Sequence, residues 1–148
     1  MNTRPLSALE SRSLAFINAA GVESALIFLT ATGMKKSIMD ATAPVRALLR
    51  QHGVHDYEQQ AQGQEHKRVM QATLLTDSDT HSLQMSLYRP KTKQGDPRLW
   101  ISMLGNYASP DDVLALFIVD AGVHIANISQ VTFDGPNVCE SDSASIRL

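Results

Sequence analysis

The chain has 148 residues, of which 43% are hydrophobic and 19% charged, and its formal net charge is −2. This length suits one domain with a sizeable core, and the charge excludes a bulk polycation of the histone kind. No apolar run approaches the ~20 residues that cross a bilayer, and the first residues lack the apolar segment of a signal peptide. The single cysteine, Cys139, excludes an internal disulfide. We therefore expect a cytoplasmic protein with no membrane partner.

The first predicted elements are a helix and a strand. Residues 5–20 place apolar side chains on one face of a helix, and Gly21 supplies its end. Residues 25–29 are a continuous apolar run, which is typical of a short buried strand. Residues 30–36 are polar and contain a glycine, so we expect a loop there.

A second helix is predicted after this loop. The sequence Ser37-Ile-Met-Asp40 resembles a capping box, and Pro44 is tolerated in a first helical turn. Apolar residues then follow at helical spacing until Gly53, which gives a helix of about ten residues. Residues 55–64 show no periodicity and are expected to form a polar loop.

From residue 67 onward the pattern changes to the period of two that indicates strands. Two alternating runs, before and after an Asp-Ser-Asp turn at residues 77–79, predict a β-hairpin with one buried face. Further short strands are expected at residues 99–103, 113–119, 123–128 and 131–133. Six or seven short strands with one or two helices, and no β-α-β alternation, predict a mainly antiparallel barrel or sandwich with helices at its ends.

One constellation resembles a metal-dependent nuclease. Asp56 is followed by Glu65-His-Lys67, and such enzymes use two carboxylates to hold Mg²⁺ and a lysine to assist the attacking water. The two acids lie in or beside a Gln/Gly-rich loop, without an apolar strand before Glu65. The alternative interpretation is that Glu65 and Lys67 form a surface pair where a strand begins.

The most distinctive stretch is Tyr-Arg-Pro-Lys-Thr-Lys-Gln-Gly-Asp-Pro-Arg-Leu-Trp, residues 88–100. It lies between two predicted strands and carries four cations opposed by Asp96 alone; the cations are Arg89, Lys91, Lys93 and Arg98. Two prolines stiffen it, which lowers the entropy lost on binding. One interpretation is a solubilising loop that protects a sheet edge. The other is a surface that binds a polyanion, since arginine suits guanine edges and lysine suits phosphate.

A second basic segment precedes a predicted helix start. Lys35 and Lys36 follow the first predicted strand, where backbone N–H groups at a helix N-terminus would also attract a phosphate. Residues 35–98 carry ten Lys/Arg and seven Asp/Glu, a net of +3, although the whole chain is acidic. A local basic surface can bind nucleic acid despite an acidic total.

The order of these features resembles a known family, the N-terminal effector-binding domain of EcoRII-type restriction endonucleases, which has a B3-like DNA-binding pseudobarrel. The resemblance covers roughly residues 23–130. Residues 87–100 together with 105–115 also resemble the segment that precedes an MvaI/BcnI-type nuclease domain in UbaLAI-like restriction endonucleases. It rests on Thr30-Ala-Thr-Gly33 with the basic residues after it, the hairpin ending at Leu87-Tyr88, the basic loop into Trp100, and Pro110-x-Asp112 before an apolar strand.

The resemblance implies a mainly β fold, a seven-stranded open pseudobarrel with one or two short capping helices over residues 23–133. Residues 1–22 would be a helical extension, and residues 134–148 a tail or a linker to a C-terminal nuclease domain. The partner would be double-stranded DNA, read in the major groove near a CC(A/T)GG-like site. DNA binding would need no cofactor, and Mg²⁺ would serve only the nuclease domain. The chain itself would therefore not be an enzyme.

Two basic arms would hold the DNA in such a fold, an N-arm at residues 30–37 and a C-arm at residues 89–98. The implied DNA-binding residues are Thr30, Thr32, Lys35, Lys36, Ser37, Arg89, Lys91, Thr92, Lys93, Gln94, Asp96 and Arg98. We expect Arg89 and Arg98 to read base edges, the lysines to contact phosphates or bases, and Asp96 to orient an arginine or accept from cytosine N4.

Some positions remain outside this scheme. Residues 40–64 do not align with the family, so contacts from Gln59, Gln60 or Gln62 are not assigned. Trp100 is expected in the core, because one tryptophan at a strand start usually packs there. A protein-interaction β-barrel is a further alternative, and it predicts no salt-dependent DNA binding.

Overall fold

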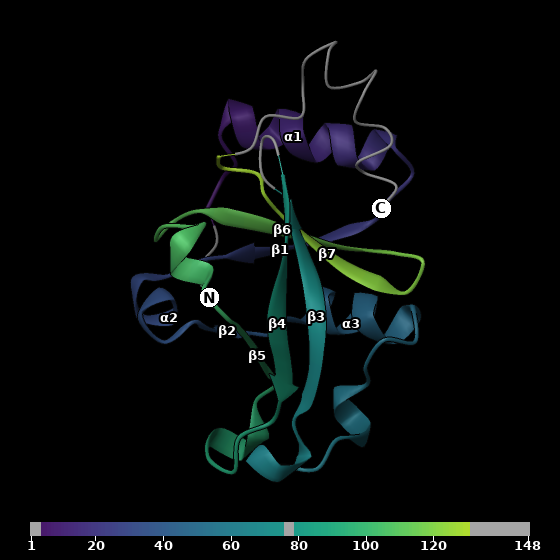
Figure 1. Cartoon of the computed structure of the whole chain (residues 1–148), viewed down its shortest axis with the longest axis vertical. Helices are drawn as coiled ribbons and strands as arrows, with labels where there is room; N and C mark the ends of the chain where they lie inside the picture. The colour runs from purple at the N-terminus through teal and green to yellow at the C-terminus, as the bar shows by residue number, and fades with distance from the viewer. Residues whose placement is uncertain (1–3, 76–78, 131–148) are drawn as a thin grey trace.

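The computed structural model describes residues 4–75 and 79–130 as a single seven-stranded sheet that curls into a nearly closed barrel (Figure 1). The mainly β, open-pseudobarrel prediction is therefore confirmed. The strand order in the sheet is β1-β6-β7-β3-β4-β5-β2. The strands are β1 Ser24–Phe28, β2 Ile38–Asp40, β3 Arg68–Leu75, β4 Thr80–Tyr88, β5 Arg98–Ile101, β6 Val113–Val119 and β7 Gly122–Asn127.

Helices fill the ends and one outer side of this barrel. Three α-helices are described, against the one or two expected: α1 Ala8–Ala19, α2 Ala31–Lys36 and α3 Ala43–Gln51. Four short 3₁₀ turns lie between strands: η1 Tyr57–Gln59, η2 Gln64–His66, η3 Lys93–Gly95 and η4 Leu104–Asn106. No helix within the described ranges is long and apolar enough to span a membrane.

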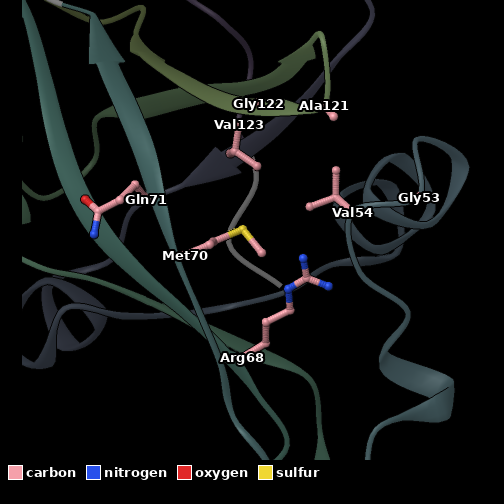
Figure 2. Close-up of a pocket in the computed structure, with 8 residues that line it drawn as sticks. All are labelled: Gly53, Val54, Arg68, Met70, Gln71, Ala121, Gly122 and Val123. Carbon is pink, nitrogen blue, oxygen red and sulfur yellow. The ribbon is translucent and has the colours of Figure 1, made fainter.

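All strand pairs are antiparallel except β3 with β7. This parallel pairing begins at Ala72 opposite Val123 and ends at Leu75 opposite Ala126, so the first half of β3 runs on without β7 beside it. A cavity of about 200 Å³ lies where the strands part (Figure 2). Its lining comes from β3, the β6–β7 turn and the segment after α3: Gly53, Val54, Arg68, Met70, Gln71, Ala121, Gly122 and Val123.

The barrel interior is the main core, and α3 closes it. Val45, Leu48 and Leu49 are buried on one side of α3 and join inward side chains of the strands. The expected helical spacing over these residues is confirmed, and Pro44 lies in the first turn. A second apolar cluster lies between α1 and the outer side of β1, β6 and β7, with Ile17 buried at its centre.

The region between β1 and α3 differs from the sequence prediction. The expected polar loop at 30–36 is helix α2, for which Thr30 is the N-cap and accepts from the Gly33 N–H at 2.9 Å. The prediction that a helix begins with a capping box at Ser37–Asp40 is wrong, because Ser37 ends α2 with φ of 57° and residues 38–40 form β2. Pairing with β5 and burial of Met39 outweigh the local capping signal.

The strand predictions in the second half are confirmed to within a few residues. The β6–β7 turn has positive φ at both Asp120 and Ala121, which is the geometry of a tight two-residue hairpin. Part of the expected turn at 77–79, the expected strand at 131–133 and the tail at 134–148 lie outside the described residues.

Candidate nucleic-acid interface

The two basic segments connect to the paired strands β2 and β5. The N-arm, residues 30–37, leads into β2, and the C-arm, residues 89–98, leads into β5. The Ala41 N–H donates to the Pro97 carbonyl at 3.0 Å, and the Ile101 N–H donates to the Ser37 carbonyl at 3.2 Å. The arms therefore meet opposite ends of β5, which are about 10 Å apart at ~3.3 Å per residue. Figure 1 shows α2 at the side of the barrel and the C-arm at its lower end.

The N-arm presents its lysines on a fixed helical turn. Lys35 and Lys36 are exposed in the last turn of α2, where positive charge suits the helix dipole. Met34 packs against the core and holds this turn in place. A side chain at Gly33 would bring Cβ within 2.8 Å of the Ile38 carbonyl oxygen, so the close approach of α2 to β2 requires glycine. Thr32 is exposed beside these residues.

Arg89, at the start of the C-arm, points into the protein rather than outward. Its Nε donates to the Gly95 carbonyl at 2.9 Å, and its Nη1 donates to the carbonyls of Gln60 and Tyr57 at 3.1 and 3.4 Å. These bonds hold the guanidinium among backbone oxygens. The structure therefore does not present Arg89 as a base-reading side chain, in contrast to the expectation from the sequence.

Arg98 has the opposite placement. Leu99 and Ile101 are buried in the core, so the alternation of β5 turns Arg98 and Trp100 to the outer side of the sheet. Arg98 lies in register between Tyr88 of β4 and Asp40 of β2. Its Nε is buried, yet it has no hydrogen-bond partner among the described residues. Such an atom is normally satisfied by water or by a ligand.

Trp100 occupies the next row of the same outer side. It lies in register between Ser86 of β4 and Ile38 of β2, and it is partly exposed rather than in either apolar core. We call the outer side of β4, β5 and β2 at these two rows the floor. The floor bridges the ends of the two arms, and it could not be inferred from the sequence because β2 was not expected.

Most other C-arm residues are at the surface. Thr92, Gln94 and Asp96 are exposed, and Gln94 has a left-handed φ of 59°. Lys93 begins the 3₁₀ turn η3. Within the described part of the chain, Asp96 has no ion pair with an arginine, so the expected orienting contact is not made here.

Residues 57–66 pack against the C-arm, a contact that the sequence did not predict. The Gly63 N–H donates to the Arg89 carbonyl at 2.7 Å, and Lys91 forms an exposed ion pair with Glu65 at 3.5 Å. The Gln60 amide donates to the Leu87 carbonyl at 2.9 Å, which makes Gln60 structural. The signal that could have revealed this contact is the pair of glycines, one in each segment.

Both glycines occupy positions where a side chain would collide with the other segment. A Cβ at Gly63 would lie 2.9 Å from the Lys91 side chain, and one at Gly95 would lie 2.7 Å from the Gln62 amide. Both residues also have positive φ. The two segments therefore approach so closely that glycine is needed on each side.

The residues of the nuclease-like pattern have local roles. Asp56 caps η1 by accepting from the Glu58 N–H at 3.0 Å. The pKa of Glu65 is lowered, first by hydrogen bonding from its own backbone N–H and then by the Lys91 ammonium. Lys67 is exposed just before β3. Across residues 4–75 and 79–130, no three His, Cys, Asp or Glu side chains gather in a way that could hold a metal ion.

Comparison of the chain with family models, with curated proteins and with solved structures finds no match. The resemblance to the EcoRII-type domain therefore stays a prediction.

Proposed function

We propose that this chain is a sequence-specific module for double-stranded DNA, which grips the major groove between its N-arm and C-arm. In this proposal it is the target-recognition part of a restriction endonuclease, and the nuclease chemistry belongs to a C-terminal domain. The module alone cleaves nothing and binds DNA without a metal ion.

The observation that carries the proposal is the unpartnered Arg98 on the floor. Its guanidinium makes no hydrogen bond or ion pair with other described residues, and its Nε is buried. A planar fork of donors held in this way matches the O6 and N7 acceptors of guanine. The arms that flank it carry Lys35, Lys36 and Lys91, which suit the backbone phosphates.

The spacing of the arms also supports this function. The arm ends are about 10 Å apart along β5, whereas the major groove is about 12 Å wide. Arms fixed at that separation can straddle the groove while the floor faces the base edges. Because β2 and β5 hold both arms, their spacing is set before binding, which lowers the entropy cost.

A randomised duplex pool tests this proposal most directly. The chain would be titrated with the pool at two salt concentrations in EDTA, and the bound DNA sequenced. We expect an enriched motif and affinity that falls with salt. Arg98→Ala should cost roughly 1–3 kcal/mol on the enriched site and relax its specificity, whereas Lys36→Ala should weaken all sequences evenly and flatten the salt slope by about one.

Three results would refute the proposal. Salt-independent retention or no retention of duplexes would favour a protein-interaction barrel. Unchanged discrimination in Arg98→Ala would remove the base-reading role of Arg98. Mg²⁺-dependent cleavage by this chain, abolished by Glu65→Ala, would establish the nuclease alternative instead.

A further inference from the structure

The C-arm and residues 57–66 interlock at several independent points. We call this pair of segments the joined loops, residues 57–66 and 89–98. Besides the Gly63 N–H bond to Arg89, the Tyr57 hydroxyl donates to the Arg98 carbonyl at 2.9 Å, and Gln60 bridges the carbonyls of His66 and Leu87. Tyr57 is buried, and burial raises the pKa of its hydroxyl. The joined loops are thus built as one body.

Arg89 lies at the centre of this body and bonds to both of its segments. Its guanidinium reaches the Gly95 carbonyl within the C-arm and the carbonyls of Tyr57 and Gln60 in the other segment. These acceptors lie up to 32 positions away in the sequence. The guanidinium donates from two nitrogens, Nε and Nη1, in fixed directions, whereas a lysine has one compact ammonium at the end of a flexible stem and does not reproduce this geometry.

The C-arm has little regular backbone structure of its own. In the described part of the chain between β4 and β5 this structure is the single turn η3, in which Gln94 has a non-helical φ of 59°. Left-handed Gln94 and Gly95 bend the arm back toward Arg89, and the Gly95 carbonyl accepts from Arg89 at that bend. Without the guanidinium, that carbonyl and those of Tyr57 and Gln60 lose a donor in a partly buried place.

We propose that Arg89 is a positioning residue that locks the C-arm onto residues 57–66, so that the arm meets DNA already in its binding shape. This inference rests on the proposed function for its DNA consequence, but the lock itself is a property of the free chain. Arg89 then acts through the residues beside it and touches neither a base nor a phosphate. Its loss should cost affinity by making the arm order on binding.

The lock is tested first without DNA, by amide hydrogen exchange of the full chain. In Arg89→Lys we expect the amides of Gly63 and Gly95 to exchange at least tenfold faster than in the wild type, while amides in the middle of β6 are unchanged. Arg68→Lys is the matched control, because Arg68 is an exposed arginine with no side-chain hydrogen bond among the described residues. Unchanged exchange in Arg89→Lys overturns the proposal whatever the chain binds.

Duplex binding then separates positioning from contact. We expect Arg89→Lys to bind the enriched duplex about tenfold more weakly with an unchanged salt slope. A slope flattened by about 0.9 would mean a lost phosphate contact, and discrimination lost at a single base pair would mean a lost base contact. Either result overturns the positioning role. Faster exchange with no DNA binding by the wild type would leave the lock standing and refute the proposed function alone.

A second variant covers the case in which Arg89→Lys does not fold. Gly95→Ala leaves the arginine in place but puts a Cβ within 2.7 Å of the Gln62 side chain, at a residue with φ of +74°. It should loosen the same junction and accelerate exchange at Gly63. Gly105→Ala is its control, since a Cβ there meets nothing within 4 Å. Equal exchange at Gly63 in both glycine variants would overturn the proposal.

Discussion

Glu10 offers the sharpest test of how this fold is held together. Its side chain is buried, and its two oxygens accept from the Arg4 guanidinium, both at 2.7 Å. It also accepts from the Ser7 N–H at 2.8 Å, which completes the capping box of α1, and from the Ser129 hydroxyl. Arg4 in turn donates to the Asp111 carbonyl at 2.7 Å, so the carboxylate joins α1 to the start of β6 and the end of β7, which lie side by side at one end of the hairpin.

These donors stabilise the charged carboxylate and lower the pKa of Glu10 from 4.5 to about 2, with Arg4 the largest cause. At about 1.36 kcal/mol per pKa unit, this lowering corresponds to roughly 3 kcal/mol of stability. A group whose pKa is lower in the folded state stabilises the fold above its unfolded pKa. This contribution is therefore full above about pH 5 and is lost as the pH falls through 4.5 toward 2.

The perturbation is Glu10→Gln, measured by urea unfolding at pH 7, 5, 4 and 3. We expect the wild type to exceed the variant by about 3 kcal/mol at pH 7 and by about 1 kcal/mol at pH 3, because the wild-type carboxylate is then losing its advantage. Glu23→Gln is the control, since Glu23 is an exposed acid just before β1. A difference between wild type and Glu10→Gln that stays constant from pH 7 to pH 3 would refute the reasoning.

Three further predictions concern the core, the floor and the N-arm. Leu49→Ala removes a fully buried side chain of α3 and should cost about 2–5 kcal/mol in thermal or urea unfolding; a loss below 1 kcal/mol would mean that α3 does not close the barrel. Trp100, the one tryptophan, should change its fluorescence when duplex DNA binds, and an unchanged emission at saturation would place the DNA away from the floor. Gly33→Ala should weaken DNA binding by displacing α2 from β2, whereas equal affinity would show that the N-arm is not needed.

Local patterns were sufficient to predict most of the fold. The alternation in β3 and β4 and the spacing of Val45, Leu48 and Leu49 in α3 reflect burial on one side of an element, which the sequence records directly. Strand β2 could not be found in this way, because three residues are too few to show a period. Its partner β5 lies about 60 residues later, and that pairing decides its structure.

Composition predicted where the candidate site lies, but it did not predict which way its individual side chains point. Four cations in a short loop identified the C-arm, and the structure leaves Lys91 exposed and turns the half-buried Arg98 to the outer side of the sheet. The inward turn of Arg89 left no trace in the sequence, because its acceptors are backbone carbonyls that any residue could supply. Periodicity and residue type record side-chain burial, whereas loop packing of this kind depends on long-range backbone geometry.

The inward turn of Arg89 also changes how the charge of the C-arm should be weighed. Counted from the sequence, four cations face one acid. In the structure Arg89 is held by three carbonyls and Lys91 shares an exposed ion pair with Glu65, a pair worth at most about 1 kcal/mol that a phosphate can replace. Among the C-arm cations whose side chains the structure describes, Arg98 is the one that combines an outward direction with an unpartnered, buried donor. The cations of one loop thus divide into those that hold the arm together and those that are free to bind a ligand. Arg98 is the residue at which recognition of DNA bases should be tested first.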